Sequence, residues 1–509
     1  MKDKRGIWNV TSGIVQQLLV LAFGLILPRL FIVGYGSEMN GLLSSVSQVY
    51  VYVSLIGGGI GTAALQALYR TTATDDHQAT NGVLAATQQI YKRAGAVYLS
   101  AVIILSAVYP LVIDASIPRL TTALIILFSG LESILSFYCH GKYKILLRAE
   151  GKNYILNNLS LITYILNSFL KIYLISRHCS IIVIQGLATV LSCWPALFLW
   201  VYVRKRYSWV NVRARPDFDA VSVRKSVVVH KVSNLVFSNT DVIILTAACG
   251  LKVVSVYSLY NSFFYMVKSL LFSCLEGVQY KLAQSFHSDF SAFKEMQERF
   301  ETVYMTLTFV LYSLLYLFIT PFMRIYTAGI TDIQYTDRYL PILFTSVFLL
   351  QAARGPMQLV AEYAQQYKET KQQAVTEMCI NLAVTLVSVY FLGIYGALLG
   401  TVAALLYRAN AIILYVNKKI LRRPPGVTYR RWGWNALVFL IVYALGKTIV
   451  ISSDSYWKLV LAAVPVSLSV VLLYIFALMI FERDTFQWIL SFIKSRIPVC
   501  AGRKQPGGN

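Results

Sequence analysis

The sequence predicts an all-α integral membrane protein with about fourteen transmembrane helices. Of its 509 residues, 57% are hydrophobic and only 14% are charged, and the mean hydropathy is +0.60. Soluble domains carry about 25% charged residues. A membrane-spanning helix needs about 20 mostly apolar residues. The segments that meet this requirement are 7–33, 39–68, 88–113, 120–140, 153–176, 180–203, 226–249, 253–280, 300–323, 339–363, 373–393, 396–416, 434–451 and 457–481.

The 46 Lys and Arg residues fall mainly in every second gap between these segments. With the N-terminus placed inside, the inner segments hold 33 of them, the outer gaps hold seven and the spans hold six. This is the positive-inside pattern, and it predicts that both termini are cytoplasmic. A net charge of +23 could also indicate nucleic-acid binding. Confinement of the charges to one side favours contact with an anionic inner leaflet.

Metal, disulfide and nucleotide sites are not indicated. The seven cysteines are isolated, without CxxC spacing, and the five histidines form no HExxH, so the cysteines are interpreted as small buried side chains. Gly446-Lys447-Thr448 resembles the end of a phosphate loop, but Ile441 stands where the leading glycine is required. No cofactor is expected, and H⁺ or Na⁺ coupling is an open possibility.

Two long basic connections divide the chain into six helices, six helices and a final pair. Gly36 and Gly250 each open a helix and are 214 residues apart, as are Gly186 and Gly400. This common offset predicts two homologous halves in parallel orientation, and transporters with such repeats usually bind substrate between the halves and alternate access. The expected domains are an N-terminal six-helix bundle at 1–204, a cytoplasmic linker at 205–225, a C-terminal six-helix bundle at 226–421, and a linker with two accessory helices and a basic cytoplasmic tail at 422–509.

Six basic residues lie inside the predicted spans. Each would cost about 2.5–3.5 kcal/mol facing lipid at a helix centre, so each is expected to face protein, water or a ligand, or to reach an interface. Arg29 is close enough to the outer interface to snorkel, and Lys171 and Arg408 are expected to snorkel or to be paired. The six are Arg29, Lys171, Lys231, Lys268, Arg354 and Arg408.

Polar residues recur at helical spacing on four of the spans. Such stripes, drawn from both halves, favour a shared aqueous cavity, although hydrogen bonding between helices would give the same pattern. The stripes are Lys231, Asn234, Ser238 and Asp241 in 226–249; Gln351, Arg354, Gln358 and Glu362 in 339–363; Ser129, Glu132, Ser136 and His140 in 120–140; and Asn9, Ser12 and Gln16 in 7–33.

Three segments resemble bacterial polysaccharide-repeat flippases, the O-antigen (Wzx-like) branch of the multidrug/oligosaccharidyl-lipid/polysaccharide exporter superfamily. They are PRLFIVGYGSEMNGLLSSVSQVYVYVSLIGGGIGTAALQALYR at 28–70, LLRAEGKNYI at 146–155 and QYKETKQQAVTEMCINLAVTLVSVYFLGIYGALLGTVAALLYR at 366–408. The resemblance runs from about residue 4 to residue 420, and the last two helices are more generic.

The resemblance implies a V-shaped pair of six-helix bundles around a basic cavity in the bacterial cytoplasmic membrane. The implied substrate is an undecaprenyl-diphosphate-linked oligosaccharide, flipped from the inner to the outer leaflet for surface polysaccharide synthesis, with the polymerase machinery as a possible partner. Cations at membrane depth suit a diphosphate, and guanidinium forks suit phosphate oxygens. The candidate site therefore comprises Arg29, Lys231, Lys268 and Arg354 for the diphosphate and sugar, Asn234, Ser238, Gln351 and Gln358 as polar lining, and Glu132, Asp241 and Glu362 as acids that pair the bases or carry a coupling ion.

Other functions remain open at this stage. A lipid II flippase would also have a basic cavity, whereas a cation-coupled multidrug antiporter of the same fold should have an acidic one. An integral-membrane polymerase or glycosyltransferase would need a sizeable outer loop with paired catalytic residues, and no outer gap exceeds roughly twenty residues. We therefore expect a transporter and no enzyme.

Overall fold

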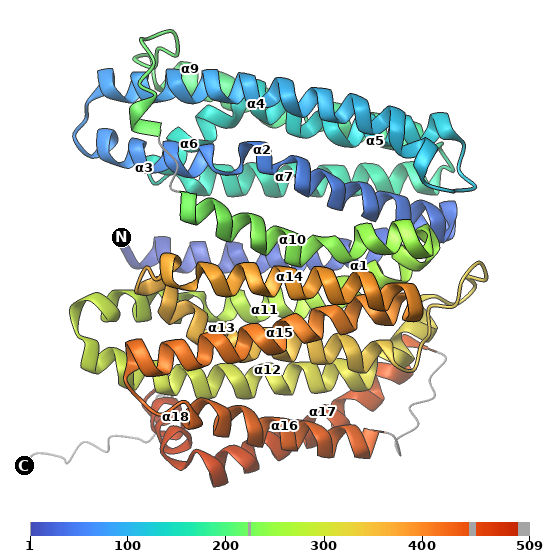
Figure 1. The fold of residues 1–509 in the computed structure, drawn as a ribbon, viewed down its shortest axis with the longest axis vertical. Coiled ribbons are helices and arrows are strands. Elements are labelled where there is room, and N and C mark those ends of the chain that lie inside the picture. The colour runs from blue at the N-terminus through green and yellow to red at the C-terminus, as the bar shows by residue number, and fades with distance from the viewer. Residues whose placement is uncertain (1, 222–224, 447–454, 497–509) are drawn as a thin grey trace, which may run out of the picture. The chain divides into compact units, whose positions relative to one another are not determined.

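A computed structural model of the chain describes residues 2–221, 225–446 and 455–496, and its regular secondary structure in this part is all helical (Figure 1). The predicted all-α membrane fold is confirmed. The helices are α1 (Lys2–Val53), α2 (Leu55–Gly58), α3 (Ile60–Ala73), α4 (His77–Val112), α5 (Arg119–Leu135), η1 (Ser136–His140), α6 (Gly141–Ala149), α7 (Asn153–Ser176), α8 (Ile181–Leu191), α9 (Trp194–Arg206), η2 (Asp219–Val221), α10 (Lys225–Cys249), α11 (Leu251–Ser288), α12 (Phe290–Tyr326), α13 (Leu340–Tyr363), α14 (Tyr367–Leu392), α15 (Ile394–Tyr415), η3 (Val416–Leu421), α16 (Gly426–Gly446), α17 (Tyr456–Phe481) and α18 (Arg483–Arg496).

Helices lie on all the predicted spans, and eleven of the described helical stretches are long and apolar enough to cross a membrane. The first predicted span and the start of the second belong to one long element, α1, which changes direction at Gly36, where φ is +84°. The rest of the second span continues through α2 and α3. Gly250 has φ of +81° and separates α10 from α11. Only glycine adopts this conformation readily, so the two landmark glycines mark the same kind of break. The end of one predicted span, 447–451, and the basic tail at 497–509 lie outside the described residues.

The chain folds into two compact units. The predicted division at 205–225 and 422–509 follows the repeat, and it stays a prediction, whereas these units follow contacts within the folded chain. Unit 1 holds Met1–Leu270, Tyr326–Val347 and Gln366–Arg408, and unit 2 holds Leu271–Ile325, Phe348–Gln365 and Ala409–Asn509.

Three connections that the charge pattern assigns to the inside meet in unit 1. The side chain of Asn81 donates to the carbonyl oxygen of Trp209 at 3.0 Å and accepts from the backbone N–H of Asn211 at 2.8 Å. The backbone N–H of Asp217 donates to the carbonyl oxygen of Gly82 at 3.1 Å. The linker after α9 is therefore fastened to the start of α4, which places both connections at one end of the unit, as the topology requires.

The third inner connection joins the same end through an ion pair. Lys152 donates to Glu150 at 2.8 Å and to the hydroxyl of Tyr207 at 2.7 Å, and Tyr207 donates to Glu150. Burial alone disfavours the ammonium, but these hydrogen bonds outweigh burial and raise the pKa of Lys152. Burial and the neighbouring Glu150 raise the pKa of Tyr207 to about 12. Both groups therefore keep their protons at neutral pH, and the contact persists.

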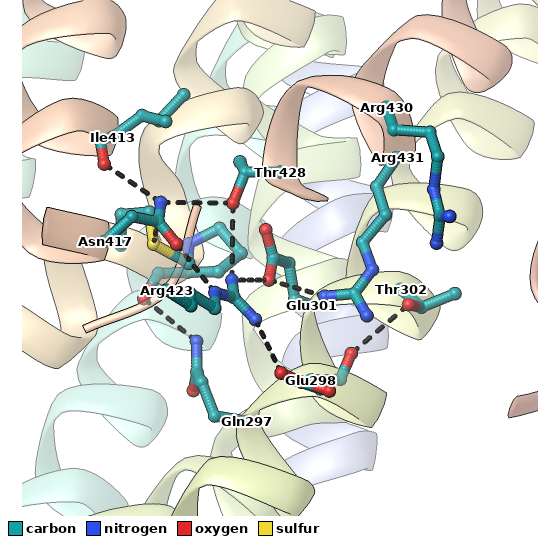
Figure 2. A network of polar contacts seen from close by, with 12 residues as sticks. Gln297, Glu298, Glu301, Thr302, Ile413, Asn417, Arg423, Thr428, Arg430 and Arg431 are labelled. Carbon is teal, nitrogen blue, oxygen red and sulfur yellow. Dashed lines mark hydrogen bonds and ion pairs between the residues drawn. The ribbon is translucent and has the colours of Figure 1, made fainter. Parts of the chain in front are cut away.

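Unit 2 holds a buried ionic network (Figure 2). Glu301 of α12 accepts from Arg423, and from Arg431 of α16 at 2.8 Å. Glu482, between α17 and α18, accepts from Arg430 at 2.8 Å and from Arg431 at 3.4 Å. The Glu301 side chain is 0% exposed. The network ties the last helices of the chain to α12.

This network corrects one expectation from the charge pattern. The basic residues of the connection after α15 were expected to lie against the anionic leaflet. The side chains of Arg423 and Arg431 are only 11% and 6% exposed and neutralise an internal carboxylate instead. Asn417, 0% exposed, holds Arg423 further by accepting from its Nε at 2.6 Å. Part of the positive charge is therefore structural.

We predict that Glu301→Gln destabilises the protein by about 3–5 kcal/mol, because it removes the fully buried carboxylate that two largely buried guanidinium groups share. Arg431 then keeps only its longer contact with Glu482, at 3.4 Å, and Arg423 its contact with the half-exposed Glu298, at 3.3 Å. The measurement is thermal unfolding of the purified protein in detergent. The matched control on the same helix is Glu295→Gln. Glu295 is 66% exposed and pairs only with Arg299, so the control should lose no more than about 1 kcal/mol. Equal losses in the two variants would contradict the assigned role of the network.

The charge pattern also predicts the orientation. Cysteines introduced at the exposed positions Asp114 and Gly426, in a background without the native cysteines, should react with a membrane-impermeant maleimide from opposite sides. Asp114→Cys should react in intact cells and Gly426→Cys only after permeabilisation. The reverse pattern would overturn the assignment of the termini to the inside.

Candidate functional site

A polar cavity of about 760 Å³ lies within unit 1. Its walls come from α1 and from the helices between α5 and α9, and they carry six serines and two threonines. Among its described lining residues, the acidic and basic side chains are Glu132, His140, Lys144 and Lys171. Ligand-binding pockets typically have volumes of about 300–1,000 Å³, so the cavity is large enough for a small molecule or a group of a larger one.

The stripe predicted on 120–140 lies along this cavity. Ser129, Glu132, Ser136 and His140 are all among its lining residues. They follow one another at steps of three or four residues, which places them on one helical face. The end of the stripe forms η1, a π-helical turn of five residues, and such turns occur frequently at functional sites.

Two lysines share the cavity with Glu132. Both Lys144 of α6 and Lys171 of α7 lie within electrostatic reach of its carboxylate. Lys171 was expected to be paired or to snorkel, and it lines the cavity. Lys144 was missed, because the predicted span ended at His140. Its position could have identified it, because Lys144 follows His140 by four residues and so continues the stripe through the next turn.

Three of the four predicted substrate-binding bases also belong to unit 1. The Lys231 ammonium donates to the hydroxyl of Thr62 at 2.6 Å. The guanidinium carbon of Arg29 lies 5.8 Å from the ring centre of Tyr326, and the Lys268 ammonium 5.7 Å from that of Tyr265. The described walls of the 760 Å³ cavity include none of these three bases. Their role in binding substrate stays a prediction.

The stripe on 339–363 lies on α13, and all four of its residues belong to unit 2. Gln351, Arg354 and Gln358 are half-buried and Glu362 is exposed. The Gln358 amide donates to Glu362 at 3.1 Å. Arg354 and its neighbours therefore remain candidates for the site, and the fourth stripe, at Asn9, Ser12 and Gln16, has its side chains outside the described residues.

Arg408 is paired, as one of the two expectations for it required. Its guanidinium lies 3.5 Å from the carboxylate of Glu377, and both residues are 6% exposed. Its Nη1 also donates to Gln373 at 2.9 Å. The pair joins α14 and α15, and it explains why Arg408 can lie inside a predicted span: a carboxylate of the protein neutralises it.

The stripe on α10 divides into two environments. Asn234 and Ser238 are exposed, whereas Asp241 is only 5% exposed. Asp241 was expected to pair a base or to carry a coupling ion. Two hydroxyls donate to it: Thr401 to Oδ2 at 2.7 Å and Tyr257 to the same atom at 3.1 Å. The Asp241 carboxylate therefore bonds hydroxyls, and its expected role in carrying a coupling ion stays a prediction.

Three buried side-chain oxygen atoms of α10 and α14 have no hydrogen-bond partner among the described residues. They are Oδ1 of Asp241, Oδ1 of Asn381 and Oγ1 of Thr385. The Asn381 amide nitrogen donates to Thr401 at 3.1 Å, which places it beside Asp241. Unsatisfied buried oxygens cost free energy, so the oxygens of Asp241 and Asn381 on either side of Thr401 indicate a place for a ligand, and Thr385 lies four residues further along the same helix as Asn381. We call Asp241, Asn381, Thr385 and Thr401 the oxygen cluster.

Two glycines of α15 bring the oxygen cluster together. A Cβ on Gly400 would collide with the side chain and backbone of Thr385, and one on Gly396 with the backbone at Ser388. Glycines four residues apart allow such close approach of membrane helices. The small residues that the sequence shows at 396 and 400 thus place Thr401 against α14.

The oxygen cluster can hold a small hard cation or a proton. A carboxylate and neutral hydroxyl and amide oxygens are the ligand types that hard cations prefer. No group of three or more His, Cys, Asp or Glu in the described part of the chain is placed to hold a metal ion, and the single formal charge here suits a monovalent cation. An ionisable group inside a membrane segment indicates function by default.

Comparison with solved structures shows which fold this is. A multidrug resistance MATE transporter of the MOP superfamily, in an inward-facing conformation, matches 80% of this chain and 95% of its own with a TM-score of 0.64 at 14% identity. The lipid II flippase MurJ, in an inward closed conformation, matches 92% and 98% with a TM-score of 0.63 at 14% identity. The MATE transporter DinF-BH in complex with R6G matches 81% and 95% with a TM-score of 0.56 at 13% identity.

Comparisons with protein-family models and with curated protein sequences find no match. Identities this low establish the fold and leave the substrate open. The chain therefore has the fold that these MATE and MurJ structures share, and it is a multi-pass membrane protein.

We predict that sodium raises the melting temperature of the wild-type protein in detergent and that Asp241→Asn abolishes this response. A ligand that binds only the folded state stabilises it by RT ln(1 + [L]/Kd), about 2.7 kcal/mol at 100-fold excess over Kd. The comparison is NaCl against choline chloride at constant ionic strength. Asp114→Asn, at an exposed position, is the control and should respond like wild type. A wild type indifferent to sodium would remove the sodium assignment, and the same comparison across pH would then test a proton.

Proposed function

We propose that this protein is a flippase for a lipid-linked oligosaccharide, with an undecaprenyl-diphosphate carrier, in the bacterial cytoplasmic membrane. It would move the substrate from the inner to the outer leaflet by alternating access, for surface polysaccharide synthesis. The observation that carries the proposal is the 760 Å³ cavity in unit 1. Its two lysines suit a phosphate group, and its hydroxyls and amides suit a sugar.

The charge balance of the cavity supports an anionic substrate. Among the described lining residues, two lysines, Lys144 and Lys171, accompany one carboxylate, Glu132. Charged residues in membrane helices are costly, so an excess of cations is best maintained where an anion compensates it. The predicted bases Arg29, Lys231, Lys268 and Arg354 extend this argument beyond the cavity. Phosphate oxygens would receive charge-assisted hydrogen bonds from Lys144 and Lys171 in the cavity.

Transport needs a source of free energy, and the oxygen cluster supplies a place for one. We propose that a monovalent cation, Na⁺ or H⁺, binds at Asp241 and that its gradient drives the return of the empty transporter. Helices α10, α14 and α15 all contribute to the oxygen cluster. Binding there would bias how these three helices pack, which is what ion coupling requires.

A lipid II flippase remains an alternative function, since lipid II also presents a diphosphate and sugars. The lipid II flippase MurJ shares the fold over 92% of this chain. A multidrug antiporter is the second alternative, but a cationic drug would meet two lysines in the described cavity. A flipping assay with each of the two lipid-linked substrates distinguishes between them.

The test is flipping of a fluorescent undecaprenyl-diphosphate sugar in proteoliposomes, under a sodium or proton gradient. Lys171→Gln should lower the initial rate at least about tenfold, since a hydrogen bond to a charged group contributes about 1.5–3 kcal/mol. Lys252→Gln is the matched control, because Lys252 is exposed at the start of α11, and it should keep the wild-type rate. Arg354→Ala tests the predicted base of α13 in the same assay.

A well-folded wild type that flips no such lipid under either gradient would contradict the proposed substrate. Lipid II in the same vesicles then tests the first alternative, and efflux of a cationic dye tests the second. Wild-type rates in Lys171→Gln would remove the unit 1 cavity from the transport path.

A further inference from the structure

Helix α1 is held against α10 and α11 by a row of polar contacts within unit 1. The hydroxyl of Ser45 lies 2.7 Å from that of Thr246, and Tyr52 bonds Thr240. The contacts run along one face of α1 after the break at Gly36. Polar groups bonded across helices in this way hold them together in a membrane.

Five side chains continue this row as one chain of hydrogen bonds at the end of α1 near Gly36. Asn40 donates to Ser255 at 2.8 Å, and Ser255 lies 2.8 Å from the hydroxyl of Tyr335. Tyr335 donates to Ser37 at 2.6 Å, and Ser37 donates to Oδ1 of Asp332 at 2.7 Å. Asn40, Ser255, Tyr335 and Ser37 are no more than 8% exposed.

Asp332 holds α1 at the residue after its break. Besides the hydroxyl of Ser37, its carboxylate accepts from the backbone N–H of Ser37 at 2.9 Å. That N–H is not committed to a regular helix because Gly36 has φ of +84°. Asp332 and Tyr335 belong to the segment between α12 and α13, which the charge pattern assigns to the outside. This segment therefore bonds both α1, through Ser37, and the start of α11, through Ser255.

Close backbone packing also holds α1 against the start of α11. A Cβ on Gly41 would collide with the backbone carbonyl of Leu251, at the start of α11. Alpha-helices approach this closely only where a glycine faces the partner. Helix α1 belongs to the first predicted six-helix half and α10 and α11 to the second, so these contacts join the two halves at their outer end.

We propose that this hydrogen-bonded chain is an outer gate, with Asp332 as its latch, and that it must open before the protein can release anything to the outside. The inference goes beyond the proposed function because it assigns the moving contacts and does not depend on which substrate is carried. Opening the gate would part the two charge-assisted bonds from Ser37 to Asp332 and the chain of hydrogen-bonded hydroxyls behind them.

The first experiment locks the gate. Ser37→Cys and Asp332→Cys, combined in the cysteine-free background, are joined with a short bis-methanethiosulfonate reagent in proteoliposomes. Cross-linking should stop flipping, and a reducing agent should restore it. The matched control joins Asp337→Cys to Tyr395→Cys, two positions within the second half whose side chains bond at 2.5 Å, and it should leave the rate unchanged. Full activity of the cross-linked gate would overturn the proposal.

The second experiment needs no substrate. Thr246→Cys, at a position 5% exposed behind the gate, reports on access of an impermeant maleimide from outside. Asp332→Asn should raise its labelling rate on the order of tenfold, which corresponds to about 1.4 kcal/mol. Asp114→Asn, an exposed acid on the α4–α5 connection, is the control and should leave the rate unchanged.

An unchanged labelling rate in Asp332→Asn would overturn the latch. If the wild type flips no lipid-linked sugar, the proposed substrate fails, and the labelling rates still decide whether the gate exists. The two failures are therefore distinguishable.

Discussion

The cost of a charge in lipid is the constraint on which this structure depends. At about 2.5–3.5 kcal/mol for each centrally placed charge, a chain with several embedded bases and acids would not remain inserted unless each found a partner or water. The protein meets this constraint in three ways. It pairs Arg408 with Glu377, gathers Glu132, Lys144 and Lys171 around a cavity, and surrounds Asp241 with hydroxyls.

The three solutions differ in what they leave for function. The Arg408–Glu377 pair is internally neutral, and nothing in it calls for a ligand. The described lining of the cavity holds two lysines for one carboxylate, so an added anion would improve its charge balance. The oxygen cluster holds one carboxylate, and one oxygen each of Asp241, Asn381 and Thr385 has no donor among the described residues, so an added cation would improve the charge balance of the cluster. Opposite charge demands in separate places are what a transporter of an anion coupled to a cation requires.

Sequence patterns predicted the parts of this arrangement that lie within one helix. The stripe from Ser129 to His140 could be read because residues three or four apart share a face. Lys144 was missed because hydropathy drops at Gly141, although α6 continues the same face. The roles of Gly36 and Gly250 were visible as helix openings, and the structure adds the positive φ that explains why glycine stands there.

What the sequence could not predict are contacts between distant segments. Thr401 reaches Asp241 across 160 residues, and a hydroxyl on an apolar helix gives no signal of its partner. The basic connection after α15 was interpreted as a surface for anionic lipid, since charge counts do not distinguish exposed from buried arginine. Glu301 and Arg423, more than a hundred residues apart, form their ion pair only because tertiary packing brings them together.

The oxygen cluster and the outer gate share one short stretch of α11. Ser255 takes part in the gate and Tyr257, two residues later, donates to Asp241. On the other side, Thr240 of α10 bonds Tyr52 of α1 while the adjacent Asp241 faces α14 and α15. Packed helices move as rigid elements with discrete arrangements. A displacement of α10 and α11 that opens the gate must therefore change the geometry around Asp241, and a cation held there must by reciprocity change the stability of the gate.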